Sequence, residues 1–330
     1  MQHLTRRRGL TAAGAALATL ASWRATPARA EDWPQRTVTI VIGFPPGTAT
    51  DSVGRLLADR LSRSLGQRFI IDNRSGQGGS IGATIVSRAA ADGYTLTIGA
   101  SAPQAINPHI YPDLTYDPRK DFTPIEQLVQ LPYMLVAGKH TGFRSLDDIV
   151  AKARAKPGAV TYATTGNGTT SQLLMAMLVK EAGVQMTHVP YRGTAQSVTD
   201  IVAGRVDITF DTMIGTLPFA RDGRVQAIAV GTKARVPIAP DVPTTAEAGY
   251  PGAQGGAWLG MLAPAGLSPS IVQRLHTEVE KILADAAFRQ AIAEMGAVVD
   301  PAGPEEFARV VRNDFDRWGE IVRVTGTKLE

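Results

Sequence analysis

Short apolar runs alternate along this chain with longer segments in which apolar residues recur every three or four positions. The first pair consists of residues 37–42, a nearly unbroken apolar run, and residues 52–65, which place Leu57 and Leu61 on one helical face before Gly66. Such a run predicts a buried strand, and the wider spacing predicts an amphipathic helix that ends at the glycine. The alternation predicts an α/β fold built on parallel strands.

The same pattern continues to the end of the chain. Further strands or extended runs are expected at 68–72, 94–98, 133–137, 160–163, 186–189, 206–210, 225–230 and 258–263. Further helices are expected at 80–90, 145–155, 172–182, 268–283, 286–295 and 304–324, with one more that ends at 203. A fresh series begins at 133, and the last strand precedes three helices. We therefore expect two lobes, one discontinuous (31–132 plus 257–330) and one continuous (133–256), joined by a hinge of two crossings.

Turns rich in glycine and proline follow the first strands. The turn at 44–51 leads from a strand into a helix, so it presents unpaired backbone N–H groups backed by the positive end of the helix dipole. Such donors suit a carboxylate. We expect this turn to hold an acidic group of a small ligand without catalysing a reaction. The turns at 73–79 and 99–103 should join it at the carboxyl edge of the sheet. From these three turns, the candidate ligand residues are Pro46, Gly47, Thr48, Asp51, Gly78 and Ser101.

The densest group of polar side chains lies in the second lobe, at 164–171, where hydroxyl and amide groups flank two glycines at a helix start. This group predicts a wall of hydrogen-bond donors, although a solvated loop with an ordinary helix cap would show the same composition. Its candidate ligand residues are Thr165, Asn167, Thr169 and Thr170.

Four charged residues leave two interpretations open. Asp51 opens a helix, where a carboxylate serves as a cap and interacts favourably with the dipole, but it could also contact a ligand. Asp211 follows a strand and either contacts the ligand or holds a neighbouring loop. Arg74 and Arg192 lie in or beside turns near the expected cleft. Either arginine could pair with a carboxylate through two hydrogen bonds, or could be an ordinary surface residue.

The first thirty residues are expected to form an export signal rather than part of the fold. Arg6, Arg7 and Arg8 precede an apolar stretch, and 28–30 has the form of a cleavage site. The arginine pair also fits a twin-arginine signal loosely, so either general (Sec) or twin-arginine export into the periplasm is possible. This segment contains five arginines and no acid, so 29 of the 34 basic residues remain against all 30 acidic ones. The remaining charge balance gives no reason to expect a nucleic-acid partner.

Several classes of chemistry are not supported by the residues. The chain has no cysteine, which excludes thiolate metal sites, cysteine nucleophiles and disulfides, and no histidine pair has metal-ligand spacing on a helix. The glycines at 76–82 do not form a dinucleotide fingerprint, because Ile81 stands where the third glycine is needed. The segment 99–103 has Pro103 where a nucleophile elbow needs glycine, and no acid is placed to orient His188 as a base. We expect no cofactor, no metal and no enzymatic activity.

Eight motifs in register resemble the receptors of tripartite tricarboxylate transporters, also called the Bug receptor family, over nearly the whole chain after residue 30. The motifs are 44–47 with Asp51, 72–74 with 76 and 78–79, 92–96, 116–118 with 121–122, 166–169, 188–193, 243–244 with 247–249, and 258 with 263–266.

The resemblance implies a type II periplasmic binding fold, α/β with two lobes, mixed sheets and a two-strand hinge, that closes over a small organic carboxylate. It implies delivery of that ligand to the membrane permease subunits of the transporter, by a protein expected to be a monomer. By position, the carboxylate would be held by Pro46, Gly47 and Thr48 of one lobe and by Thr165, Asn167, Thr169 and Thr170 of the other. A periplasmic sensor that reports the same ligand to a signalling partner is an alternative, and an enzyme on this fold is a remoter one.

Three positions depart from the family pattern and leave the identity of the acid open. Thr48 replaces a second glycine in the first turn, and the turn at 75–79 lacks the usual Pro-Gly-Ala-Gly-Gly order. Gln172 stands where a histidine often follows the Gly-x-Gly-Thr turn, which removes a titratable donor.

Overall fold

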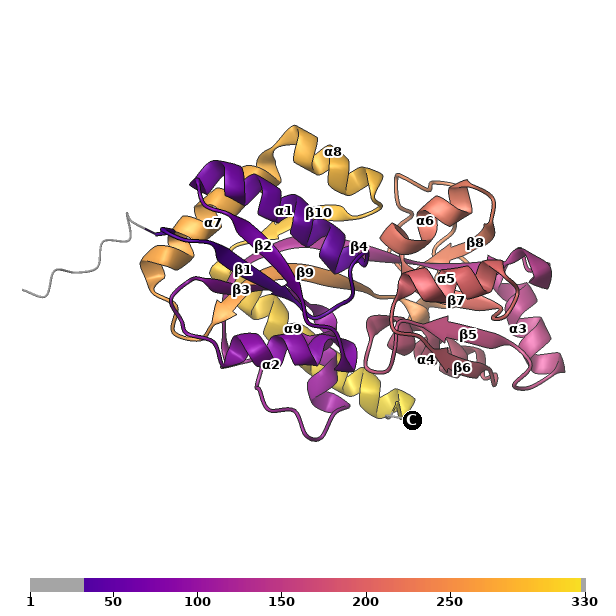
Figure 1. Cartoon of the computed structure of the whole chain (residues 1–330). Coiled ribbons are helices and arrows are strands. Elements are labelled where there is room, and N and C mark those ends of the chain that lie inside the picture. The colour runs from indigo at the N-terminus through magenta and orange to yellow at the C-terminus, as the bar shows by residue number, and fades with distance from the viewer. Residues whose placement is uncertain (1–32, 328–330) are drawn as a thin grey trace, which may run out of the picture. The chain divides into compact units, whose positions relative to one another are not determined.

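The computed structural model describes residues 33–327 of the 330-residue chain (Figure 1). The export signal expected at residues 1–30 lies outside the described residues. From Pro34 onward the chain forms one compact unit. Within the described part, no helix combines the length and the apolar character needed to cross a membrane.

One mixed sheet, with ten strands in the described residues, organises this unit. In its first half β1 is parallel to β2 and β3, whereas β9 is antiparallel to both β3 and β4. The spatial order there is β2 (Phe69–Asn73), β1 (Val38–Ile42), β3 (Thr95–Ala100), β9 (Gly256–Pro264) and β4 (Phe122–Gly138).

The second half of the sheet repeats this arrangement. Strand β5 is parallel to β6 and β7, and β4 is antiparallel to both β7 and β8. The spatial order is β6 (Thr187–Pro190), β5 (Thr161–Thr164), β7 (Ile208–Thr212), β4 and β8 (Val225–Val230). The α/β class expected from the sequence is confirmed, with a sheet that is mixed rather than purely parallel.

Strand β4 belongs to both halves and changes partners between two consecutive residues. Pro132 lies opposite Gly256 of β9, and Tyr133 lies opposite Thr212 of β7. The chain therefore passes from one half of the sheet to the other inside a single strand.

The strand expected at 133–137 is too short, because β4 begins at Phe122. Pro124 breaks the strand pattern in the sequence, since proline cannot donate a ladder hydrogen bond. In the structure the register shifts directly after Pro124, and such an irregularity is where a strand tolerates proline.

Helices flank the sheet. In the first half, α1, α7 and α8 lie on one side and α2 and α9 on the other (Figure 1). Strand β10 (Val298–Ala302) adds to β4, and the sequence pattern predicts neither it nor α6, which contains Pro218. The helices are α1 (Ala49–Leu65), α2 (Ser80–Ser87), α3 (Leu146–Ala155), α4 (Thr170–Ala182), α5 (Thr194–Val202), α6 (Met213–Arg221), α7 (Pro269–Ala284), α8 (Ala286–Glu294) and α9 (Pro304–Thr325).

The C-terminal helix α9 packs on the first half of the sheet through one aromatic contact. Phe307 is fully buried, and its ring meets the ring of Trp258 edge-on at 5.0 Å between centroids. A Cβ at Gly260 would lie 2.1 Å from the Phe307 ring, so glycine is required beneath it. The Trp258 indole N–H donates to Asp314 at 2.7 Å, which ties α9 to β9 a second time.

Replacing Phe307 with alanine should lower the free energy of unfolding by about 3–5 kcal/mol, because the ring leaves a cavity that the sheet cannot fill. Urea unfolding followed by far-UV circular dichroism measures the change. Ile85→Ala on α2 is the control, since Ile85 is 40% exposed and its loss should cost much less. Equal effects from the two variants would contradict the packing described here.

Candidate functional site

Two adjoining cavities lie where the turns of the two sheet halves meet. The inner cavity has a volume of about 50 Å³. The first half contributes Phe44, Thr48, Ala49, Thr50, Ala100 and Ala102, and the strands that cross between the halves contribute Leu131, Tyr133, Ala257 and Leu259. The second half contributes Thr165, Thr169, Thr170, Arg192, Gly193, Thr194, Asp211 and Thr212.

The outer cavity is larger, about 410 Å³, and is lined by the glycine-rich turn at 75–79, by Tyr111 and by the turn at 165–167. Phe44, Thr165 and Arg192 line both cavities, so they mark the passage between them. Among the described residues that line the two cavities, Arg192 is the one cationic side chain and Asp211 the one acidic side chain. Arg192 therefore borders both cavities, whereas Asp211 borders the inner cavity alone.

Fewer residues of the turn at 44–51 reach a cavity than the sequence suggests. Thr48 lines the inner cavity, whereas Pro46 and Gly47 are exposed and line neither cavity. Gly47 has φ of +80°, and its N–H donates to Asp51 Oδ2 at 2.9 Å. The Thr48 hydroxyl donates to the Pro45 carbonyl at 2.8 Å. The Gly47 amide is thus already engaged within the turn, whereas Ala49 and Thr50 of the first turn of α1 line the inner cavity.

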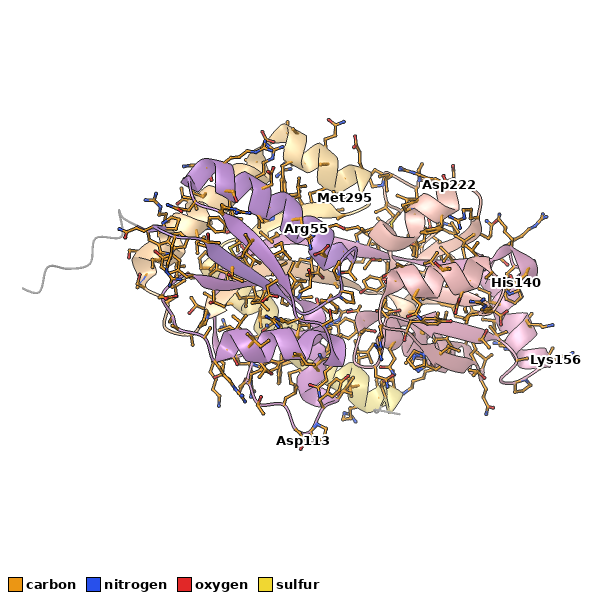
Figure 2. All side chains as sticks on the ribbon, in the orientation of Figure 1. Arg55, Asp113, His140, Lys156, Asp222 and Met295 are labelled. Atoms are coloured by element: carbon orange, nitrogen blue, oxygen red, sulfur yellow. The ribbon has the colours of Figure 1, made fainter. Side chains whose placement is uncertain are left out.

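Asp51 lies behind this turn and holds it together. Its carboxylate is buried and also accepts hydrogen bonds from Asn73 and from Arg55, the α1 residue labelled in Figure 2. Burial opposes ionisation of Asp51, but the hydrogen bonds from Arg55, the Gly47 amide and Asn73 outweigh it and lower the pKa of the carboxyl. Asp51 therefore holds the turn that precedes α1, and it lines neither cavity.

The turn before α4 is built around a helix cap. The Thr169 hydroxyl donates to the Gly166 carbonyl at 2.7 Å and accepts from the Gln172 amide at 3.4 Å. The Gln172 side chain in turn accepts from the Gly168 amide at 2.8 Å. The glutamine therefore closes the turn from within, and the exposed donors of this segment are fewer than its composition suggests. Thr165 and Thr170 line the inner cavity with Thr169, and Asn167 lines the outer one.

The outer cavity is bounded by a contact between the two halves, which we call the cross-cleft contact. The Tyr111 hydroxyl, from the first half, donates to the Asn167 carbonyl of the second half at 3.0 Å. Gly78, with φ of +57°, lies so close that a Cβ there would be 3.2 Å from the same carbonyl oxygen. Burial raises the pKa of Tyr111, so the hydroxyl remains a donor at neutral pH. Sequence reasoning missed Tyr111, because it lies in an irregular segment with no pattern.

Ser101 has a structural role. Its side chain is fully buried and does not line either cavity. Its hydroxyl oxygen accepts a hydrogen bond from the backbone N–H of Trp258 at 3.0 Å. The bond ties the end of β3 to β9. Its neighbours Ala100 and Ala102 are the residues that reach the inner cavity.

Asp211 is the penultimate residue of β7 and is 1% exposed. Its Oδ1 accepts the Thr212 amide at 2.6 Å, while Oδ2 has no hydrogen-bond partner among the described residues. Burial raises the pKa of Asp211 to about 6, although the Thr212 amide and the Thr194 side chain oppose the shift. Tyr133, fully enclosed beside Asp211 and Thr170, has a raised pKa for the same reason and stays protonated. Neither Tyr133 nor Thr194 was a candidate from the sequence, although Thr194 follows the expected turn at 190–193.

The described residues contain no group of three or more acidic or histidine side chains that could hold a metal ion. The residues that line the two cavities, within the part of the chain that the structure describes, include no histidine, lysine or glutamate. Such walls can hold a small anion by hydroxyl groups, an amide-rich turn and one guanidinium.

Comparisons with known proteins agree with this geometry. A family model described as "Tripartite tricarboxylate transporter family receptor" matches residues 53–327. Protein BugT of Bordetella pertussis is 34% identical over 307 residues, which cover 93% of this chain and 94% of the relative. A solved structure of an R. palustris protein with adipate has a TM-score of 0.88 and 36% identity, and covers 90% of this chain and 100% of the other. The structure of the periplasmic binding protein BugD has a TM-score of 0.85 and 32% identity over the same shares.

The hydrogen bonds that the Asp51 carboxylate accepts predict a pH-dependent loss of stability. Because the pKa of Asp51 is lowered in the folded protein, its stabilising contribution is present above the unfolded pKa of about 4 and disappears as the pH falls through the folded value. Asp51→Ala should therefore cost about 1–2 kcal/mol at pH 7 and progressively less below pH 4.

Urea unfolding of the variant and the wild type between pH 7 and pH 3 measures this difference. Asp59→Ala is the matched control, because Asp59 forms an exposed pair with Arg63 on the same helix and should change stability little. A variant that loses ligand affinity while its stability is unchanged would show that Asp51 contacts ligand instead.

Proposed function

This chain belongs to the family of tripartite tricarboxylate transporter receptors, and from this premise we propose that it captures a small organic carboxylate in the periplasm and delivers it to the permease of such a transporter. The observation that carries the proposal is the pair of cavities where turns from both halves of the sheet meet, with Arg192 bordering both. The adipate complex of the R. palustris protein supports an organic acid as the ligand class. The description of BugD as a periplasmic binding protein supports the compartment.

The two halves of the sheet are proposed to act as the two lobes. Strand β4 changes partners between Pro132 and Tyr133, and β9 begins at Gly256. These positions support lobes of 31–132 plus 257–330 and of 133–256. Because the chain crosses twice between the halves, the two crossing segments would absorb the change of backbone angles on opening, as a hinge does.

The ligand carboxylate is proposed to lie between Arg192 and the threonines of the second half, near Thr48. Thr165, Thr170 and Arg192 all line the inner cavity, and no acidic side chain of the described residues forms an ion pair with Arg192. Hydrogen bonds to a charged group contribute about 1.5–3 kcal/mol each. A few of them offset ordering and desolvation and leave the roughly 8 kcal/mol that micromolar affinity requires.

Binding would be coupled to closure of the lobes. Donors from both halves surround the inner cavity, so a ligand there contacts the second half fully only when the lobes are together. A ligand with this preference shifts the population toward the closed arrangement. The permease would then distinguish loaded from empty receptor by shape. No chemical step is proposed, and the described residues that line the cavities include no histidine, lysine or cysteine.

A panel of small carboxylates, each paired with its neutral primary amide, tests the ligand class. At least one acid should raise the melting temperature while its amide of nearly the same shape does not, since a bound ligand stabilises the folded state by mass action. Stabilisation by amides to the same extent as by acids would overturn the proposal.

With the acid that binds, Arg192→Ala should raise Kd about tenfold, because one charge-assisted pair at a partly solvated position is lost. Isothermal titration calorimetry measures it. Arg221→Ala is the control, since Arg221 is an exposed arginine of α6 that lines neither cavity. Unchanged affinity in Arg192→Ala would remove Arg192 from the site.

The cross-cleft contact makes a separate prediction about closure. Tyr111→Phe removes the hydroxyl that donates to Asn167, so the closed state loses about 0.5–1.5 kcal/mol and Kd should rise about two- to tenfold through faster dissociation. Stopped-flow fluorescence measures the dissociation rate. Tyr191→Phe is the matched control: Tyr191 also lines the outer cavity, but its hydroxyl donates to Asp200 within the same half. Equal dissociation rates in the wild type and Tyr111→Phe would show that the contact does not hold the lobes together.

A further inference from the structure

Two consecutive residues of the inner cavity wall each contain a polar side-chain atom that nothing in the described residues satisfies. Asp211 Oδ2 and Thr212 Oγ1 are both buried without a hydrogen-bond partner, and both residues line this cavity. Asp211 is 1% exposed and Thr212 is 6% exposed. Leaving a buried polar group unpaired costs free energy, so a pair of such atoms in a cavity wall needs an explanation in terms of what enters the cavity.

The surroundings do not supply a cation for Asp211. The crossing strands contribute Leu131 and Leu259 to the walls, and the first half contributes Phe44 and alanines. The titratable groups that share the cavity are Tyr133 from β4 and Arg192 from the loop before α5. The helices packed against β7 add only the hydroxyls of Thr170 from α4 and Thr194 from α5 among the described lining residues. Arg192 also borders the outer cavity, so a carboxylate held by Arg192 lies at the side of the inner cavity that adjoins the outer one.

We propose, resting on the function proposed above, that Asp211 together with Thr212 selects carboxylates that carry a hydrogen-bond donor, a hydroxyl or an ammonium group, at the end opposite the carboxylate held near Arg192. The donor would bond Asp211 Oδ2. The ligand then lies with its acidic end toward the outer cavity and its donor end toward β7.

A second carboxylate at the inner end fits less well. Two carboxylates within a few ångströms repel each other, and one of them must take up a proton. A ligand without any polar group at this end would leave Asp211 Oδ2 unpaired in a cavity that it fills. In a site built to bond a donor, an analogue lacking that donor is rejected strongly, because the buried acceptor is left without a partner.

Isothermal titration calorimetry with two matched trios of acids tests the inference. The first trio is butanoate, 4-hydroxybutanoate and 4-aminobutanoate, and the second is benzoate, 4-hydroxybenzoate and 4-(aminomethyl)benzoate. In at least one trio, a donor-bearing member should bind the wild type about tenfold or more tightly than its parent. The affinities of the hydroxyl member and the amino member of each trio show which kind of donor the protein prefers.

Asp211→Asn keeps the shape of the side chain and removes its charge. It should abolish the preference for an amino member and retain part of the preference for a hydroxyl member, because the Asn carbonyl still accepts. Asp211→Leu should abolish both preferences, and thermal melting shows whether each variant is folded. The matched control is Asp207→Asn: Asp207 precedes β7 and accepts hydrogen bonds from Thr161 away from the cavities, so the preferences should be those of the wild type.

The pH dependence of binding distinguishes a ligand with a donor group beside Asp211 from a ligand with a second carboxylate there. If an ammonium pairs with Asp211, its affinity should fall as the pH drops below about 6, where burial places the pKa of this carboxyl, and Asp211→Asn should lose the dependence. A dicarboxylate that binds more tightly at low pH, in a manner that depends on Asp211, would overturn the inference. Equal binding of parents and derivatives by the wild type would also overturn it and leave the proposed function standing. Failure of every acid to bind contradicts the proposed function itself.

Discussion

The site depends on one structural constraint: strand β4 forms backbone hydrogen bonds with both halves of the sheet. Pro132 pairs toward β9 and Tyr133 toward β7, so no linker separates the halves at this point. Asp211 lies opposite Met134, one residue beyond the change of partners. The floor of the inner cavity therefore consists of the crossing strands themselves. Any change in the relative position of the halves alters the distance between Asp211 and the first-half turns, which is how a ligand between them can be coupled to closure.

The alternation of strand and helix was predictable because burial imposes a simple period on each element. Residues 37–42 and 52–65 show it most clearly, and the structure forms β1 and α1 there. The prediction was wrong where a second force competes with the period. Pro124 concealed the first part of β4, which tolerates it beside a register shift, and Pro218 lies inside α6. Strand β10 was not predictable for a different reason: it contains Pro301, is partly exposed, and exists because β4 offers it an edge.

The location of the candidate site was more predictable than the task of each residue. Turns at the ends of β1, β3, β5 and β7 do meet, as strand order requires. A sequence shows how many donors a turn contains, but not which of them are already used. The Gly47 amide bonds Asp51, Thr169 caps α4, and Ser101 accepts from Trp258. These are tertiary or local bonds of ordinary kinds, so composition alone overstates the number of free donors.

Gly78 and Gly168 lie on opposite sides of the outer cavity, where the two halves come too close together for a larger residue. A Cβ at Gly168 would lie 2.6 Å from Asn107 Oδ1 and 2.8 Å from the Tyr111 ring, and Gly168 has φ of +74°. Across from it, Gly78 meets the Asn167 carbonyl. At this cavity backbone therefore approaches backbone beside the Tyr111–Asn167 hydrogen bond, which contributes about 0.5–1.5 kcal/mol net. Lys180 and Arg317 form further side-chain hydrogen bonds between the halves away from the cavities. The Tyr111–Asn167 hydrogen bond alone stabilises the closed arrangement only slightly relative to the open one. A ligand that binds the closed arrangement more tightly than the open one adds to this stabilisation, and its release reverses that contribution.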